Sequence, residues 1–155
     1  KRFDENDIRE IFTLRAALEG LACEIVIEKN LLEPANLEQL ESYIEQQKEA
    51  ILDQDFERLT QLDMAFHRLI CETANMERLT KMWQSLHIQM QVLFRMRLKA
   101  RPEYIPQTVS RDHSAILKAM RESDIETFAE INQEVNQRVA AECIEVIQAM
   151  EQQEQ

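Results

Sequence analysis

The sequence predicts an all-α protein whose helices pack as one antiparallel bundle. Its 155 residues contain one glycine, Gly20, and three prolines, which leaves little room for the tight turns of a sheet protein. Residues with high helix propensity (Leu, Glu, Gln, Ala, Met and Arg) dominate the chain. Apolar residues recur at helical spacing in six segments. With 45% hydrophobic residues, the length suits a single domain, 1–155, with one core.

The first three helices are expected in the first half of the chain. One is predicted at Asp7–Lys29, where Asp7 followed by Glu10 is a start signal. A second begins near Pro34, since proline is favoured in a first turn, and a third spans Asp55–Ala74. The apolar face of the first helix consists of Ile8, Ile11, Phe12, Leu18, Leu21, Ala22, Ile25 and Val26.

Three further helices complete the prediction. The fourth spans Glu77–Ala100, and two prolines then interrupt the helical pattern over Arg101–Pro106. The fifth spans Gln107–Glu122. A capping box formed by Ser123 and Glu126 is expected to start the last helix, which reaches about residue 151.

Charge and cysteine content exclude several classes of function. The formal net charge of −11 repels a phosphate backbone, so any DNA binding requires a segment other than this one. The three cysteines (Cys23, Cys71 and Cys143) form no CxxC pattern and are expected to be buried cytosolic thiols. There is no signal peptide and no apolar run near the ~20 residues of a membrane helix. We therefore expect a cytoplasmic protein without a membrane partner, and a fragment of a longer chain.

Three polar residues occupy positions where the pattern calls for apolar ones. Asp63 and His67 are four residues apart on the third helix and share its apolar face. His113 is in register with the apolar residues of the fifth helix. One carboxylate and two imidazoles form the ligand set of a divalent metal with open positions. The alternative is an internal Asp63–His67 hydrogen bond, with His113 as a hydrogen-bonded core histidine.

Arginines also interrupt apolar faces. Arg15 lies within the apolar stripe of the first helix, where a buried guanidinium needs a carboxylate from the protein or from a ligand. The alternative is an arginine at the edge of the stripe whose charge reaches solvent. Arg95 and Arg97 lie on different sides of the fourth helix, so only one of them is expected to face inward.

Three segments resemble the motifs of one known family. The segment Leu14–Glu19 resembles the opening Arg-x-x-Leu-Glu signature of the FCD domain, the effector domain of FadR-type GntR transcription regulators. The segment Asp63–His67 resembles the Asp-x-x-Phe-His motif of that domain. The segment Asp112–Leu117 resembles its (Glu/Asp)-His-x-x-Ile-Leu motif. The three motifs occur in the family's order, and the resemblance covers essentially the whole chain.

The resemblance implies a fold, ligands and partners. It implies an antiparallel bundle of six to seven helices that binds a small organic acid or a related metabolite in a central cavity. In many members an aspartate and three histidines hold a divalent metal that helps to bind the carboxylate of the effector. It also implies a homodimer, and control of DNA through an N-terminal winged helix-turn-helix domain that this chain lacks.

The sequence departs from the family pattern at the third metal histidine. Alignment from His113 through Asp124 places Val135 at that position, with Asn132 and Asn136 beside it. A divalent metal (Zn, Ni or Mn) is therefore expected to be weakly bound or absent. The residues expected to bind the effector are Arg15, Asp63, His67, His113, Arg95, Arg97 and Asn132.

Two function classes follow from these residues. We expect a sensor without enzymatic activity, whose effector binding controls a separate DNA-binding domain. The alternative is a mononuclear metal-dependent helical-bundle enzyme that uses Asp63, His67 and His113. The paired Glu-x-x-His motifs of a di-iron bundle are not present in the sequence.

Overall fold

A computed structural model describes residues 2–155 and contains six α-helices. Helices account for nearly all of these residues, and no strand occurs among them, so the predicted all-α fold is confirmed. None of the six helices is long and apolar enough to cross a membrane within the described part of the chain. The helices are α1 (Glu5–Glu28), α2 (Pro34–Leu52), α3 (Phe56–Thr73), α4 (Glu77–Ala100), α5 (Ile105–Arg121) and α6 (Ile125–Gln153).

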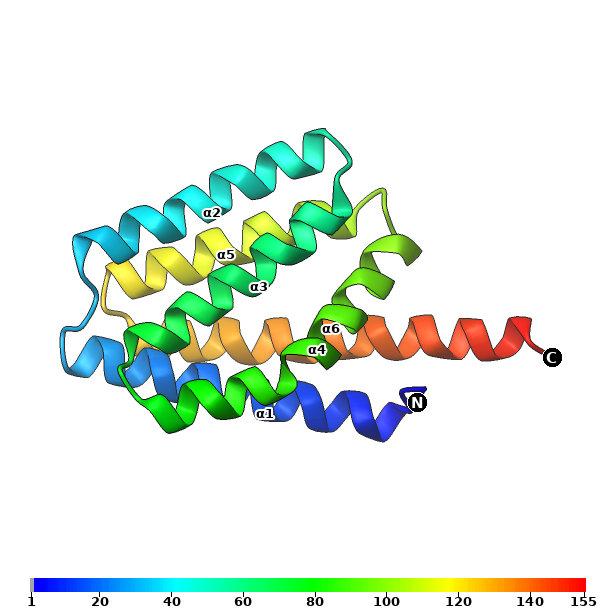
Figure 1. The fold of residues 1–155 in the computed structure, drawn as a ribbon, viewed down its shortest axis with the longest axis horizontal. Helices are drawn as coiled ribbons and strands as arrows, with labels where there is room; N and C mark the ends of the chain where they lie inside the picture. Colours follow the sequence, from blue (N-terminus) through cyan, green and yellow to red (C-terminus); the bar gives the residue numbers. More distant parts are fainter. Residues whose placement is uncertain (1) are drawn as a thin grey trace.

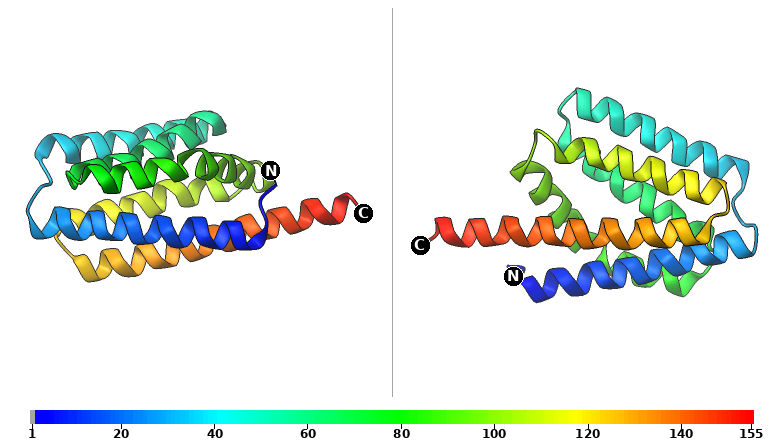
Figure 2. Two further views of the ribbon diagram at one scale, coloured as in Figure 1. Left: turned by 60° about the horizontal axis from the view of Figure 1, so that its bottom comes forward. Right: turned by 180° about the vertical axis from the view of Figure 1, so that it is seen from behind.

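The helices pack in two groups. Helices α1 and α6 run antiparallel along one side of the molecule (Figure 1) and contact one another along their length. Helices α2, α3 and α5 form the other group, in which α2 packs against both α3 and α5. Helix α4 crosses between the groups and contacts α1, α3 and α6. Figure 2 shows that the start of α1 and the end of α6 lie at the same end of the bundle.

Two helices begin one or more residues away from their predicted caps. Asp4 caps α1, because its carboxylate accepts from the Asp7 amide (2.8 Å) and the Asp7 carboxylate accepts from the Asp4 amide (3.0 Å). Asp124 caps α6 by accepting from the Thr127 amide at 3.0 Å. The predicted cap at Ser123 is wrong because Ser123 has a φ of 54°, a left-handed conformation that closes the preceding turn.

Four of the connections between helices use a left-handed residue that is not glycine. Asn30, Gln54, Asn75 and Ser123 have φ between 53° and 55°. At Gln54 the amide donates to Ile51, and the next amide donates to Ala50 at 2.9 Å. This pair of bonds satisfies the last carbonyls of α2, as in a Schellman motif. Because the one glycine of the chain, Gly20, lies inside α1, these turns place residues that have a Cβ atom in the left-handed region, which costs energy.

The core is continuous between the two groups of helices. The largest fully buried side chains include Trp83 of α4 and Phe66 of α3, which lie in one cluster with residues of α1, α2, α5 and α6. A smaller cluster at the α4–α5 connection contains Leu59, Leu98 and Ile105. Helix α5 starts at Ile105, two residues before the predicted boundary, because Pro106 fits a first turn.

Candidate metal and effector site

Three predicted polar residues converge inside the bundle. The Asp63 Oδ1 atom lies 3.2 Å from Nε2 of His67 and 3.1 Å from Nε2 of His113. The two Nε2 atoms are 3.0 Å apart. All three residues are at most 5% exposed. The one-turn spacing on α3 and the inward face of α5 therefore bring three donor atoms to one point.

Both imidazoles are held from behind by acceptors on other helices. The Nδ1 atom of His67 contacts the Glu19 carboxylate of α1. The Nδ1 atom of His113 lies 2.9 Å from the Gln47 Oε1 atom of α2. The His113 ring also stacks on Phe66, with centroids 4.2 Å apart and an interplanar angle of 11°. In each ring Nδ1 thus faces an acceptor, and Nε2 faces Asp63.

The buried guanidinium of Arg15 has its carboxylate within the same helix. Its Nε donates to Glu19 Oε2 at 2.8 Å, and the Trp83 indole donates to the same oxygen at 3.1 Å. Its Nη2 lies 2.6 Å from His67 Nε2. Arg15 is 2% exposed, so the alternative of an arginine that reaches solvent is wrong.

The pKa values follow from burial and from these contacts. Burial raises the pKa of the Asp63 carboxyl, but hydrogen bonds from His113 and His67 outweigh it and hold that pKa well below its usual value. Burial also raises the pKa of the Glu19 carboxyl, but the charges of Arg15 and His67 outweigh it, and that pKa falls to about 2. Burial lowers the pKa of His113. Both carboxylates therefore stay ionised in the core at neutral pH.

The three donors have the spacing of one face of a metal coordination sphere. Bonds of ~2.0–2.2 Å place neighbouring donors about 3.0 Å apart at right angles and about 3.4 Å apart at tetrahedral angles. The three distances, 3.0, 3.1 and 3.2 Å, lie in this range, and these are the side chains in the described residues that group as metal ligands. Asp63 also contacts both imidazoles, so the same geometry satisfies the hydrogen-bonded alternative.

A small cavity adjoins the donors. Its volume is about 10 Å³, room for roughly one water molecule. Its lining comes from α1, α3, α4, α5 and α6 and includes Val135, the residue at the family's third histidine position. Arg15 and Arg97 also line this cavity. An organic acid therefore has to move side chains or helices in order to enter.

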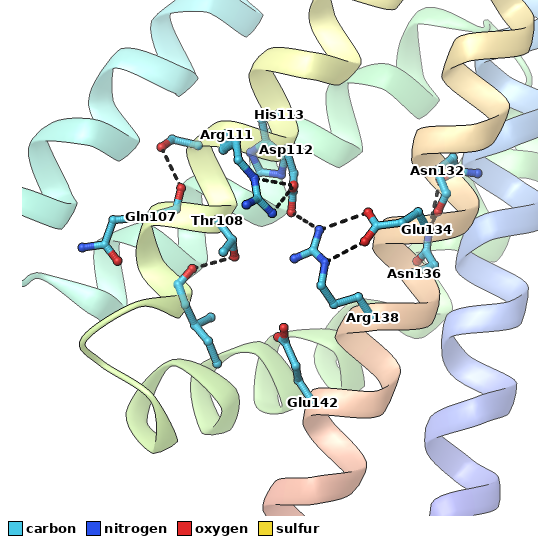
Figure 3. Close-up of polar contacts among 12 residues, drawn as sticks. Gln107, Thr108, Arg111, Asp112, His113, Asn132, Glu134, Asn136, Arg138 and Glu142 are labelled. Atoms are coloured by element: carbon cyan, nitrogen blue, oxygen red, sulfur yellow. Dashed lines mark hydrogen bonds and ion pairs between the residues drawn. The ribbon is translucent and has the colours of Figure 1, made fainter.

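A second layer of charges lies beside the cavity between α4, α5 and α6. Arg138 Nη2 donates to Asp112 Oδ2 at 2.7 Å, and its Nε donates to Glu134 at 3.0 Å (Figure 3). Arg97 Nε lies 3.4 Å from Glu142 Oε2, but neither atom makes a hydrogen bond within the described residues. The free Nη1 of Arg138 is also buried without a hydrogen bond. Of these two arginines, Arg97 lines the cavity, so one cationic donor there has hydrogen-bonding capacity that is not used.

Two of the predicted site residues lie elsewhere. Arg95 forms a bidentate contact with Glu57 on the surface, at 2.7 and 2.6 Å, while Arg97 faces inward, as expected for only one of the two. Asn132 donates to the Ala16 carbonyl at 2.9 Å and lines a groove between α1 and α6. Arg95 is two residues from Arg97 and therefore lies on the opposite side of α4, whereas Asn132 is turned toward α1 by its hydrogen bond to Ala16.

The sequence did not predict the two side chains that contact the Nδ1 atoms of the histidines, Glu19 and Gln47. Glu19 is four residues after Arg15, the spacing of a helical ion pair, and this signal was available in the sequence. Gln47 carried no such signal, because its contact with His113 depends on how α2 packs against α5.

Comparison with known proteins assigns the chain to one domain family. The profile of the FCD domain matches residues 10–138, and the chain belongs to this domain family. The match includes the motifs at Arg15, Asp63 and His113. A comparison with curated proteins gave no match.

Solved structures share the fold at low sequence identity. A GntR family transcriptional regulator from Pseudomonas syringae pv. tomato str. DC3000 has a TM-score of 0.84 at 21% identity, over 99% of this chain and 62% of that chain. McbR/YncC of E. coli has a TM-score of 0.79 at 23% identity, over 90% and 69%. Lar, described as controlling the Listeria monocytogenes agr system and mediating virulence, has a TM-score of 0.77 at 12% identity, over 91% and 65%. The chain thus spans about two thirds of each.

Proposed function

We propose that this chain is the ligand-sensing and dimerisation domain of a GntR/FadR-type transcription regulator. In this proposal a small organic acid binds in the central cavity and controls DNA binding by a separate N-terminal domain. The observation that carries it is the convergence of Asp63, His67 and His113 in a cavity lined by five helices. The membership of the chain in the FCD family supports the same conclusion.

The charges of the site favour an anionic ligand once a divalent metal is present. With neutral imidazoles, Arg15, Glu19 and Asp63 carry a net charge of −1. A divalent ion held by Asp63, His67 and His113 makes this total +1 and supplies a Lewis acid for a carboxylate. Arg97, with its unused Nε donor at the cavity, provides a second cation for the same anion.

The closed cavity suits a sensor because binding has to rearrange the bundle. A ligand larger than water displaces side chains that belong to five helices. A ligand shifts an equilibrium between two conformations only by its difference in affinity for them. The ligand-bound arrangement would therefore differ from the closed one, which is the property that transmits occupancy to another domain.

The test is binding of a panel of mono-, di- and tricarboxylates by calorimetry, with and without added Zn²⁺, Ni²⁺ or Mn²⁺. We expect an acid whose affinity depends on metal and falls at least about tenfold in Asp63→Asn, which removes the metal-binding charge but keeps the side-chain shape. Glu72→Gln, which neutralises an exposed carboxylate on the same helix, is the matched control. Failure of every acid to bind in the presence of metal would contradict the proposal.

The rival is the mononuclear enzyme, which is favoured by the same two-histidine, one-carboxylate set. The two functions differ in what happens to the bound acid. Incubation of the panel with protein and added Fe²⁺ or Zn²⁺, followed by mass spectrometry, should return the acids unchanged. Turnover that disappears in Asp63→Asn would favour the enzyme.

A further inference from the structure

Arg97 of α4 is a buried cation at the cavity that lacks a well-formed ion pair. The residue is 3% exposed and lines the cavity together with Asp63 and the two histidines. Its Nε atom lies 3.4 Å from Glu142 Oε2, yet neither atom makes a hydrogen bond within residues 2–155. A buried guanidinium is costly when its donors are unpaired. Arg97 therefore has a carboxylate beside it but not the hydrogen-bonded partner that its burial requires.

Glu142 of α6 is the more exposed member of this contact. Its side chain is 18% exposed, against 4% for that of Arg97, so Glu142 lies on the solvent side of the guanidinium. A carboxylate at such a position can turn into water and be hydrated there, whereas the Arg97 charge stays buried. Glu142 can therefore be exchanged for another carboxylate while Arg97 keeps its place at the cavity.

The two arginines of the cavity both lie against the ring of Phe94. The Cζ atom of Arg15 is 5.0 Å from the ring centroid, and that of Arg97 is 5.8 Å from it. The two guanidinium carbons are therefore at most 10.8 Å apart, the sum of these distances. Arg15 Nη2 in turn lies 2.6 Å from Nε2 of His67, one of the three candidate metal donors. A short organic chain can thus reach from the donors to Arg97.

The other carboxylate at this end of the cavity, that of Asp112, is already paired. Asp112 lines the cavity and accepts from Arg138 Nη2 at 2.7 Å, and its second oxygen lies 3.3 Å from Arg111 Nη2. Arg138 is one turn before Glu142, and Figure 3 shows that both project from the same side of α6. The charge of Asp112 is thus compensated by two arginines, which reduces its repulsion of an anion bound at Arg97.

We propose that the effector is a dicarboxylate whose second carboxylate replaces Glu142 beside Arg97. The inference rests on the sensing function proposed above and names the class of acid. The first carboxylate binds at the metal, and the second accepts from the Arg97 guanidinium, whose planar donors match the two oxygens. With a divalent metal, the donor site and its Arg15–Glu19 pair carry a charge of +1. Arg97 raises this charge to +2 when Glu142 turns into solvent, and a dianion neutralises it.

Acids of equal chain length test the requirement for a second carboxylate. Succinate and butyrate have the same number of carbon atoms, as do glutarate and valerate, and the members of each pair differ in the second carboxylate alone. Their affinities are measured by calorimetry with the metal-loaded chain. We expect the diacid of at least one pair to bind about tenfold or more tightly than its monoacid, because a charge-assisted arginine–carboxylate contact is gained.

Two variants should change the affinity for the diacid in opposite directions. Arg97→Met keeps much of the bulk and removes the charge, so it should weaken the diacid about tenfold or more and the monoacid less than about threefold. Glu142→Gln removes the competing carboxylate and should tighten the diacid by about tenfold. Arg95→Met is the matched control, because Arg95 lies on the same helix but pairs with Glu57 at the surface. Melting by circular dichroism confirms that each variant folds.

The outcomes separate this inference from the function on which it rests. If no acid binds in the presence of metal, both are overturned. If each monoacid binds as tightly as its diacid, the dicarboxylate is overturned and the sensor of a simpler acid stands. A preference for the diacid that Arg97→Met leaves intact overturns the subsite at Arg97. If Arg97→Met does not fold, an unchanged affinity for the diacid in Glu142→Gln overturns it instead.

Discussion

The Glu19 carboxylate on α1 contacts Nδ1 of His67 on α3, and this contact fixes which nitrogen of the ring faces Asp63. Glu19 also accepts from Arg15 and Trp83, so its position is set by three partners. Carboxylates behind a metal-ligating histidine fix its tautomer and ring orientation. The same residue thus balances a buried cation and orients a candidate ligand.

Glu19→Gln should therefore reduce both stability and metal affinity. The substitution keeps the shape but leaves the Arg15 charge uncompensated in the core, a loss of about 3–5 kcal/mol for a broken buried pair. Metal affinity should fall ~10–100-fold because the ring is no longer held. Urea unfolding and metal titration measure the two effects.

The matched control is Glu72→Gln, which removes the equivalent one-turn partner of Arg68 on the surface of α3. Its effect on the free energy of unfolding should stay below about 0.5 kcal/mol. If Glu19→Gln were as mild as this control, the Glu19 assignment would be wrong.

Val135→His should tighten metal binding. Val135 lines the cavity with the three donors, and an imidazole there adds a fourth protein ligand. We expect weak, exchangeable metal in the parent and stoichiometric metal in the variant, as measured by metal analysis after dialysis. Val92→His, which adds a histidine to a partly exposed position of α4, should leave the metal content unchanged. Tight metal in the parent would show that another group fills the position.

The three cysteines should be unreactive in the native state. Cys23, Cys71 and Cys143 are free and at most 1% exposed. Burial raises the pKa of Cys23 and of Cys143 to about 12. At pH 8 only about one thiol in 10,000 is then ionised, and the thiolate is the reactive form. A thiol reagent should detect no cysteine before unfolding and three in denaturant. Rapid native labelling would contradict the packing described here.

Gln54→Gly should stabilise the chain. Gln54 is exposed and has a φ of 54°, a conformation that glycine adopts without a steric penalty. We expect a gain of about 0.5–1 kcal/mol in the free energy of unfolding. Asp53→Gly is the control, because Asp53 has a φ of −80° and glycine should there destabilise by a similar amount. Urea midpoints compare the two, and effects of equal sign would be inconsistent with this turn.

Helical periodicity was sufficient for the fold and for the centre of the site. The apolar faces of the third and fifth helices placed Asp63, His67 and His113 in one core, where the structure finds them in contact. The register of Val135 came from the family motifs rather than from periodicity, since one residue of misalignment rotates a helix by about 100°. Asn132, almost one turn before Val135, packs against α1 because its amide donates to the Ala16 carbonyl.

The parts that sequence did not reveal depend on contacts between helices. Gln47 reaches His113 across 66 positions of the chain, and nothing in local spacing encodes that approach. The predicted start of the last helix was wrong for a different reason. Ser123 and Asp124 are both good capping residues, and the choice between them depends on which one takes the left-handed conformation at the end of α5.

The closed cavity around Asp63 sets a limit on how fast a ligand can arrive. Because about 10 Å³ admits a single water molecule, entry has to wait for side chains or helices to move. Such motions occur on microsecond to millisecond timescales, far slower than diffusional encounter at high ligand concentration. The observed association rate should then level off as the acid concentration rises, and the plateau reports the opening rate of the bundle itself.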